Sequence, residues 1–482
     1  MTAAAPLSPT GDLVIQTARR EVAPGEECTL IVTLSAQPAA PLEQFELTFP
    51  GFTALTPPAV RPEGGVTVRG RLDRPGFHAF AAAALIDGRH VTGRDYFVVR
   101  DPPPFTATHE AGYYVFLGCG DCPIVIEKET HALADWTLQQ WKDLVSWMGA
   151  NGMNRLWTLV NGYTLVYPSK RWPALRDRYA RNVREDFLRE LIDHAHGCGV
   201  KIYLMLTTDG HARDFSQAYP EAARQDASGE PGVHYGLALE HPLTRDYIFG
   251  VLDEVLELYP NADGIAVHPT ESDPDRFNPE SLAAYRTETD RDLRAEPKEA
   301  RRAWHNLAFA RFMREFAARC HRHNPALDLV MANCWWQDDH VTINHATLPP
   351  DMRIAVWHYA WEDTEAKPWP IFRWHEAFGA DRLIYVPTSQ SYLYPKDPCQ
   401  VMTRHIGIDL LVSTAATLGV RNTMYFAGWD ILPEPARLLD VALVRHPTAT
   451  LAADPASQRQ MIPELYADYF SARTAALRSA GR

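Results

Sequence analysis

Residues 244–273, which read TRDYIFGVLDEVLELYPNADGIAVHPTESD, decide the fold predicted for this chain. Apolar side chains recur at helical spacing in the first half, so Thr244–Leu258 is predicted to form an amphipathic helix. Gly264–His268 is a short apolar run and predicts a buried strand. Acidic residues follow that run, at Glu271 and Asp273. The stretch therefore predicts a helix, then a strand, then an acidic strand end.

Strand and helix patterns alternate through the whole region after Thr106. Eight apolar runs predict strands at Tyr113–Gly118, Asn154–Val160, Lys201–Thr207, Gly264–His268, Leu327–Asn333, Arg353–Tyr359, Arg382–Pro387 and Asn422–Ala427. Helical spacing is found at Leu138–Ala150, Arg184–His196, Thr244–Leu258, Ala300–His323 and Gln400–Thr417, whereas Gln337–Pro350 is irregular. Eight successive β-then-α units are typical of a (β/α)₈ TIM barrel in the α/β class. No glycine-rich phosphate loop is present in the sequence, which disfavours nucleotide-binding folds.

Residues 12–100 have a different, all-β pattern. Short apolar or alternating runs occur at Leu13–Gln16, Cys28–Leu34, Phe45–Phe49, Val66–Leu72, His78–Ile86 and Val91–Val99. Asp87-Gly88 lies between the last two runs and predicts a tight hairpin turn. About seven short strands in this region suggest an immunoglobulin-like β-sandwich.

A proline-rich linker, Asp101-Pro102-Pro103-Pro104, separates the two patterns. We therefore expect a β-sandwich domain with its linker over residues 1–104. Residues 105–482 are expected to form the barrel, followed by a C-terminal helix near Ile462–Leu477. An open parallel sheet with two unpaired edges would contradict this architecture.

The charge balance disfavours two classes of partner. The 482 residues include 47 Lys+Arg and 60 Asp+Glu, which gives a net charge of −13. Nucleic acids and anionic membrane surfaces are bound by clustered Lys and Arg, so we expect neither as a partner. The first 20 residues lack the apolar core of a secretory signal, and no apolar stretch is long enough to span a membrane. With seven cysteines, the sequence suggests a cytoplasmic protein with reduced thiols.

The Cys119-Gly120-Asp121-Cys122 motif is the one pattern that could suggest a metal or redox site. A structural zinc site usually needs a second cysteine pair, and the other five cysteines do not form one. A redox motif expects a thioredoxin-like context, which a barrel does not provide. The sequence therefore favours small residues that pack a loop, and we expect no metal and no cofactor.

Polar and aromatic residues are found at the predicted strand ends, where TIM barrels carry their active sites. The candidate substrate-binding residues are Asp209, His211, His268, Asn333, Trp335, Trp336, His358, Trp361, Gln390 and Trp429. Tryptophan rings stack on sugars, although Trp is also a common core residue. We expect at least two of Trp335, Trp336, Trp361 and Trp429 to line one pocket and to bind a carbohydrate.

The fourth strand end carries the most specific signal. Glu271 and Asp273 lie two residues apart, so an extended segment would point both side chains the same way. Two carboxylates in a partly buried site repel each other, so the pKa of one rises and that group can donate a proton at neutral pH. We expect Glu271 to be a general acid. The alternative is that Asp273-Pro274 caps a turn and Glu271 is solvated.

The segment from His241 to His268 resembles the one that precedes the catalytic strand in two groups of glycoside hydrolases. These are the β-hexosaminidase-type and α-glucuronidase-type families, which also tend to place a β domain before a barrel. The resemblance implies a glycoside hydrolase fold and hydrolysis of a glycosidic bond. Hexosaminidases end this strand with an adjacent Asp-Glu pair, whereas this chain has Glu271-x-Asp273. In the α-glucuronidases a Glu after strand four acts as the acid, and carboxylates from later strands activate water.

The second catalytic carboxylate has three candidate positions. Asp273 can assist a substrate acetamide while Glu271 protonates the leaving oxygen. Glu362 or Asp363, after the sixth strand, can act as the base of an inverting enzyme, and Asp430 can act from the eighth strand. Many retaining barrel glycosidases carry a Glu nucleophile at strand seven, but Ile384–Gln390 contains no carboxylate.

Two other functions are compatible with the sequence. A metal-dependent barrel isomerase or hydrolase would draw its ligands from Asp209, His211, His268, Glu271, Asp273 and His358. No H-x-H follows the first strand and no H-E-x-x-H motif occurs, so this ligand set has no recognisable pattern. A catalytically silent carbohydrate-binding barrel would keep the tryptophans and tolerate the loss of Glu271.

Overall fold

The computed structural model describes residues 13–17, 19–34, 43–61, 65–86, 88–99, 110–118, 132–231, 236–269, 275–333, 337–358, 370–387, 412, 415–428 and 434–445. Contacts divide the chain into two compact units. The described elements of the first unit are strands β1–β9 and helix α11 (Glu434–Arg445). The second unit runs from β10 to β17. Because α11 contacts β8 and β9, it groups with the N-terminal strands. The expected domain boundaries, 1–104 and 105–482, stay a prediction.

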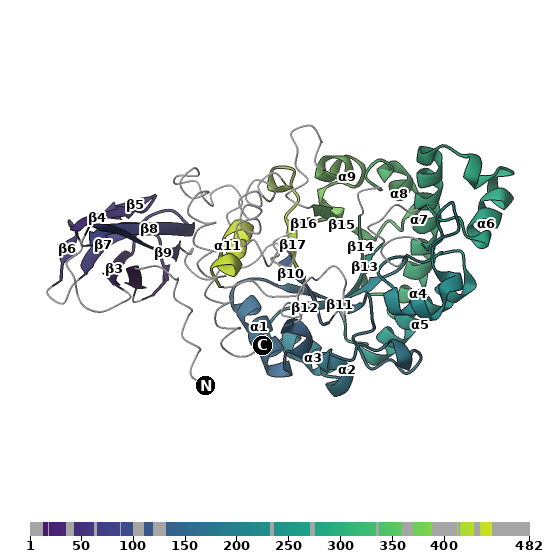
Figure 1. Cartoon of the computed structure of the whole chain (residues 1–482), viewed down its shortest axis with the longest axis horizontal. Helices are drawn as coiled ribbons and strands as arrows, with labels where there is room; N and C mark the ends of the chain where they lie inside the picture. The colour runs from purple at the N-terminus through teal and green to yellow at the C-terminus, as the bar shows by residue number, and fades with distance from the viewer. Residues whose placement is uncertain are drawn as a thin grey trace. The chain divides into compact units, whose positions relative to one another are not determined.

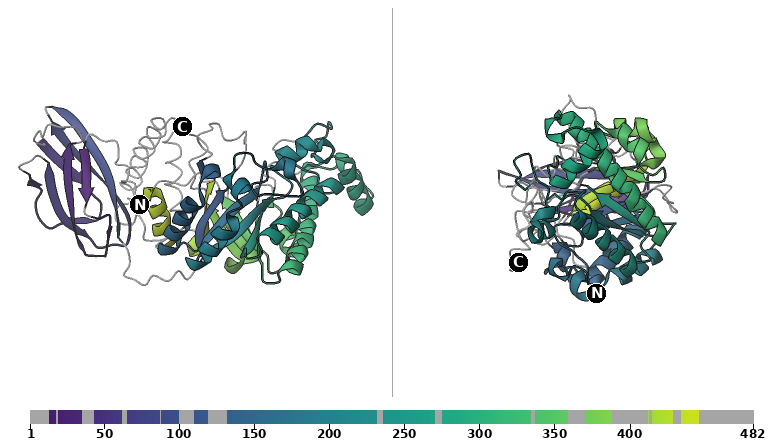
Figure 2. Two further views of the ribbon diagram at one scale, coloured as in Figure 1. Left: turned by 90° about the horizontal axis from the view of Figure 1, so that it is seen from below. Right: turned by 90° about the vertical axis from the view of Figure 1, so that its right-hand side faces the viewer.

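The first unit is built from two sheets around one apolar core. Its strands are β1 (Leu13–Thr17), β2 (Glu21–Val22), β3 (Glu27–Leu34), β4 (Glu43–Thr48), β5 (Phe52–Ala54), β6 (Ala59–Val60), β7 (Val66–Leu72), β8 (Gly76–Ile86) and β9 (Arg89–Val99). One sheet has the order β1-β3-β7-β5, with β6 also on β7, and the other has the order β2-β9-β8-β4. Figure 2 shows these purple strands in face-to-face layers. The arrangement is that of a β-sandwich, and the immunoglobulin-like topology stays a prediction.

Alternating burial explains why these residues form a two-layer structure. Along β7 every second side chain is buried, so Val66, Val68 and Leu72 face the shared core. The expected hairpin is confirmed, because β8 and β9 pair antiparallel from Gly76↔Val99 to Ile86↔Arg89. Gly88 has a φ of 75°, a conformation that a residue with a Cβ atom rarely adopts in a tight turn.

The second unit contains a closed barrel of eight parallel strands, as predicted. The strands are β10 (Ala111–Phe116), β11 (Arg155–Asn161), β12 (Lys201–Thr207), β13 (Gly264–His268), β14 (Asp328–Ala332), β15 (Arg353–His358), β16 (Leu383–Pro387) and β17 (Asn422–Gly428). They pair in chain order, and β17 closes the ring on β10. Every residue of β13 is buried, because its strand has the barrel interior on one side and helices on the other.

Helices pack outside this ring of strands (Figure 1). The described helices are α1 (Leu138–Ala150), α2 (Arg181–Glu185), α3 (Leu188–Gly197), α4 (Arg213–Ala218), α5 (Pro242–Leu258), α6 (Pro279–Thr289), α7 (Lys298–His323), α8 (Val341–Thr347) and α9 (Pro370–Phe378). The start of α1 is set by a capping box, in which Gln140 N–H donates to the Thr137 hydroxyl and Thr137 N–H donates to the Gln140 amide oxygen. No described helix is long and apolar enough to cross a membrane.

Several helix predictions differ from the structure. The single helix predicted at Arg184–His196 is two helices, because Asp186 adopts a left-handed backbone with a φ of 47° and ends α2. The irregular connection Gln337–Pro350 contains the short helix α8. The helices α4, α6, α9 and α11 were not predicted. The helix predicted at Ile462–Leu477, and most of Gln400–Thr417, lie outside the described residues.

Candidate active site

The C-terminal ends of the eight barrel strands meet at one edge, because all eight strands are parallel. This edge is where TIM-barrel enzymes carry their catalytic residues. The strands end there at Phe116, Asn161, Thr207, His268, Ala332, His358, Pro387 and Gly428. Most of the predicted site residues follow these positions, so the site is described from this edge.

His268 lies inside the ring of strands at this edge. It is the last residue of β13, and 5% of its surface is exposed. Its Nδ1 atom lies 3.4 Å from the hydroxyl oxygen of Tyr114 on β10. Its ring packs against Trp357 of β15, with 4.8 Å between the ring centroids. Neither β10 nor β15 is a neighbour of β13 in the barrel, so these contacts cross the interior.

His211 lies beside His268. The two imidazole rings meet edge to face, with 5.5 Å between their centroids. The His211 Nδ1 atom lies 3.2 Å from the hydroxyl oxygen of Tyr163. His211 has a φ of 57°, a left-handed conformation that costs energy for a residue with a Cβ atom. Backbone strain of this kind is concentrated at functional sites.

Aromatic rings from other strands surround Tyr114 in the barrel interior. Trp157 of β11, Trp357 of β15 and Phe426 of β17 have ring centroids 6.4, 5.6 and 4.9 Å from that of Tyr114. The Trp357 and Phe426 rings are 4.3 Å apart. These rings form an apolar wall next to the two histidines. In such a low-dielectric environment, hydrogen bonds and charges interact more strongly than in water.

Asp209 lies at this edge beside two other charged residues, Arg276 and Glu240, which form an ion pair. Its side chain is 1% exposed, and its Oδ1 atom accepts a hydrogen bond of 3.1 Å from the Thr208 hydroxyl. The Arg276 guanidinium is fully buried, with Nη1 3.8 Å from Asp209 Oδ2. Arg276 also donates two hydrogen bonds to Glu240, of 3.1 and 2.9 Å. Burial raises the pKa of Glu240, but the charge and hydrogen bonds of Arg276 outweigh this effect, so the pKa lies below its usual range.

His305 on α7 accepts a hydrogen bond from the backbone of Arg276. The Arg276 N–H donates to His305 Nε2 over 3.2 Å, so the ring proton of the neutral imidazole is on Nδ1. Burial, together with the charges of Arg276, Arg224 and Arg301, holds the pKa of His305 well below its usual value. This contact fixes the backbone of Arg276, two residues after the acidic segment 270–274.

Asn333 links β14, β15 and α9. Its side-chain oxygen accepts the backbone N–H of Trp357 over 2.5 Å, and its Nδ2 donates to Asp338 Oδ1 over 2.8 Å. The Trp374 Nε1–H donates to the same oxygen over 2.7 Å. Burial raises the pKa of Asp338 to about 6, against the lowering effect of these hydrogen bonds. Asn333 therefore positions Trp357, and its predicted role in substrate binding stays a prediction.

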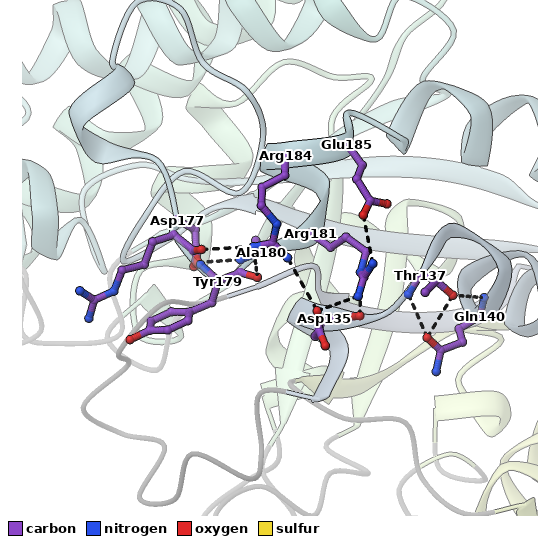
Figure 3. A network of polar contacts seen from close by, with 10 residues as sticks. Asp135, Thr137, Gln140, Asp177, Tyr179, Ala180, Arg181, Arg184 and Glu185 are labelled. Carbon is purple, nitrogen blue, oxygen red and sulfur yellow. Dashed lines mark hydrogen bonds and ion pairs between the residues drawn. The ribbon is translucent and has the colours of Figure 1, made fainter. Parts of the chain in front are cut away.

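Ordered loops form part of the rim around this edge. Figure 3 shows Arg181 of α2 joined to Asp135, which ends a short 3-10 helix (Ala132–Asp135) between β10 and α1; the hydrogen bond is 2.9 Å long. In the loop after β11, Asp177 accepts the Thr164 hydroxyl over 2.9 Å. The same carboxylate accepts the N–H groups of Tyr179 and Ala180, over 2.7 and 2.9 Å. The chain segments that follow two neighbouring strands are thus tied to each other.

The structure brings together part of the predicted site. His211 and His268 are in contact, and Asp209 lies two residues before His211 on the same strand end. The backbone of His358 ends β15, and nothing is described for its side chain. The other predicted residues lie outside the described part of the chain: Glu271, Asp273, Trp335, Trp336, Trp361, Glu362, Gln390, Trp429 and Asp430.

Sequence reasoning missed several residues of this edge. Tyr114 lies in the middle of a strand, and no motif distinguishes it from a core residue. Arg276 and Glu240 are ordinary charged residues until folding buries them together. Asp338 had a usable signal, because it follows the fifth strand closely. Among the described residues, no group of three or more His, Cys, Asp or Glu side chains is placed to hold a metal ion.

These features define a (β/α)₈-barrel protein with buried polar groups and an aromatic wall at the C-terminal edge. No family model matches the chain, and no curated protein sequence matches it. Among solved structures, a β-galactosidase from the psychrophilic Marinomonas ef1 is similar, with a TM-score of 0.50 and 12% identity. That match covers 73% of this chain and 61% of the β-galactosidase. The resemblance to barrel glycoside hydrolases is thus confirmed as a likeness of fold.

Two further solved structures have lower scores. An α-L-fucosidase isoenzyme 2 from Paenibacillus thiaminolyticus has a TM-score of 0.47 at 13% identity, over 70% of this chain and 49% of the other. A chitobiase from Flavobacterium johnsoniae has a TM-score of 0.47 at 14% identity, over 80% of this chain and 55% of the other. The chain spans about half the length of these two proteins.

Proposed function

We propose that this protein is a glycoside hydrolase that cleaves a glycosidic bond by carboxylate acid/base chemistry at the C-terminal edge of the barrel. One observation carries the proposal: His268 ends β13 inside the buried cluster of His211, Tyr114 and Trp357. Glu271 follows His268 by three residues. Three peptide units span at most about 11 Å, and we therefore propose Glu271 as the acid that acts beside this cluster. The likeness to a β-galactosidase fold is compatible with this proposal.

In this proposal Glu271 is the general acid that protonates the leaving oxygen. Asp273, two residues later, favours the protonated form of Glu271 through charge repulsion. The second carboxylate is Asp273 itself, Glu362 or Asp363, or Asp430. A separation of about 5–5.5 Å between the two carboxyl groups predicts retention of configuration, and about 6.5–9.5 Å predicts inversion.

The described polar groups suit a carbohydrate substrate. The imidazoles of His211 and His268 can donate or accept hydrogen bonds, as sugar hydroxyl groups require. Asp209 adds a carboxylate that accepts hydrogen bonds and is fixed by Thr208 and Arg276. We propose that these groups bind ring hydroxyls. Trp335, Trp336, Trp361 and Trp429 are proposed to stack on sugar rings, because each follows a strand that ends at this edge.

The first test is hydrolysis of a panel of 4-nitrophenyl glycosides, which vary in sugar and anomer, with and without EDTA. We expect release of nitrophenolate from at least one sugar, unchanged by EDTA. Activity that EDTA removes and a divalent metal restores would favour the metal-dependent alternative. Binding of sugars without turnover of any substrate in the panel would favour the carbohydrate-binding alternative.

A further inference from the structure

Helices α1 and α3 approach each other closely at their C-terminal ends. Gly149, near the end of α1, has no side chain, and a Cβ atom there would lie 2.4 Å from the carbonyl oxygen of Cys198. Only glycine permits this approach without a shift of the backbone. Cys198 caps the end of α3, so the contact places its thiol against the side of α1.

Three reactive side chains meet at this contact. The Ser146 hydroxyl oxygen of α1 lies 3.0 Å from His194 Nε2 of α3. The Cys198 sulfur lies 3.6 Å from the same Nε2 atom and 3.7 Å from the Ser146 oxygen. His194 and Cys198 are four residues apart, so both lie on one face at the end of α3. Ser146 is exposed and Cys198 is partly exposed.

We propose that Cys198 is a thiol modification site, at which His194 is the base and soft electrophiles or peroxides are the reagents. As the sulfur attacks, the S–H proton passes to His194 Nε2 and the Ser146 hydroxyl donates a hydrogen bond to the sulfur. With hydrogen peroxide, a bond forms between the sulfur and one peroxide oxygen while the O–O bond breaks. The other oxygen takes the proton from His194 and departs as water, which leaves cysteine sulfenic acid.

The surroundings favour this role for His194. The charged groups one turn away, Lys142 on α1 and Glu190 on α3, form an ion pair of 2.5 Å with each other. Each neutralises the other, so neither charge dominates the field at the imidazole.

This cluster is distant from the candidate active site. Cys198 lies three residues before β12 begins at Lys201, whereas the candidate active site lies where the strands end. The other described cysteines are poor competitors for a reagent. Burial raises the pKa of Cys28 to about 11 and that of Cys320 to about 12, so both thiols stay protonated.

The test measures the rate of alkylation of each cysteine by iodoacetamide, in the native full-length protein, by peptide mass spectrometry. We expect Cys198 to react faster than N-acetylcysteine at pH 7. His194→Gln should slow alkylation of Cys198 by about tenfold or more, because a positioned base is lost. The difference should shrink at pH 9, where hydroxide removes the proton. Ser146→Ala should slow alkylation of Cys198 less than His194→Gln does.

The matched control is His196→Gln, which removes a histidine from the same turn whose imidazole contacts the Asp263 carboxylate. This variant should leave the rate at Cys198 unchanged. An equal rate in wild type and His194→Gln, or a wild-type rate no higher than that of N-acetylcysteine, overturns the proposal. The result is independent of the proposed glycosidase activity, which alkylation of Cys198 should leave unchanged.

Discussion

Asp338 shows how burial changes the chemistry of a single residue at the C-terminal edge. Its Oδ1 atom accepts two hydrogen bonds, from Trp374 and Asn333, yet burial still raises its pKa to about 6. In the unfolded chain an aspartate ionises near pH 4. Between these two pH values the folded protein binds more protons than the unfolded chain. The free energy of unfolding therefore falls as the pH rises from about 4 to about 6, and this contribution is constant above that range.

Asp338→Asn tests this contribution. The amide keeps an oxygen that accepts both hydrogen bonds but carries no charge to bury. We expect a higher melting temperature than wild type at pH 7–8, and a difference that vanishes towards pH 4. The full contribution is at most about 3 kcal/mol. Thermal unfolding at several pH values measures it.

The matched control for this test is the exposed neighbour, in the variant Asp339→Asn. Its melting temperature should follow the wild-type pH dependence. If Asp338→Asn and wild type show the same pH dependence, the buried carboxyl group does not ionise as described.

At the scale of elements, one carboxylate of α5 holds the loop that follows β11. Glu254 accepts hydrogen bonds from the Tyr167 hydroxyl over 3.1 Å and from the Ser169 hydroxyl over 2.5 Å. It also accepts the backbone N–H groups of Lys170 and Arg171. A carboxylate has acceptor sites for all four donors, whereas an amide replaces half of them with donors. Four donors of the segment 167–171 therefore share one acceptor side chain.

Glu254→Gln should loosen this loop without unfolding the barrel. Lys170 and Arg171 are exposed, so water can replace the lost acceptor, and each lost hydrogen bond costs about 0.5–1.5 kcal/mol. We expect faster hydrogen exchange at the amides of Lys170 and Arg171, and unchanged exchange in β12. Glu257→Gln is the matched control, because Glu257 is exposed on the same helix. Unchanged exchange at Lys170 and Arg171 in the Glu254 variant would contradict this account of the loop.

At the scale of the whole molecule, the barrel was predictable from sequence for a physical reason. Strands buried on both sides require continuous apolar runs, so Lys201–Thr207 and Gly264–His268 were predicted with the bounds that the structure has. The break between α2 and α3 was not predictable in this way. It depends on the left-handed Asp186, whose carboxylate accepts the Tyr259 hydroxyl from 73 residues away.

The candidate site was predictable only where residues follow a strand end. His211 and His268 were identified because TIM barrels carry chemistry at those positions. Tyr114 was not, because its contact with His268 joins residues 154 positions apart. The burial of Arg276 beside Glu240 and Asp209 likewise depends on three separate loops. Such contacts result from closure of the barrel, and local sequence patterns do not record them.

The central claim is that Glu271 donates the proton to the leaving group of a glycoside. The direct measurement compares wild type and Glu271→Gln on two substrates of the same sugar, an unactivated alkyl or oligosaccharide glycoside and a 2,4-dinitrophenyl glycoside. General acid catalysis contributes about 10²–10⁴-fold, so kcat/KM for the unactivated substrate should fall by at least that factor. The loss should be much smaller for the dinitrophenyl substrate, whose leaving group needs no proton.

The change from Glu to Gln is isosteric, so the melting temperature should stay close to that of wild type, and Glu257→Gln provides an exposed control for both measurements. A large loss on the unactivated substrate with a small loss on the activated one is the predicted result. Near-normal activity of Glu271→Gln on the unactivated glycoside would contradict the claim and would assign the acid to another carboxylate, with Asp273 and Glu362 the next to test.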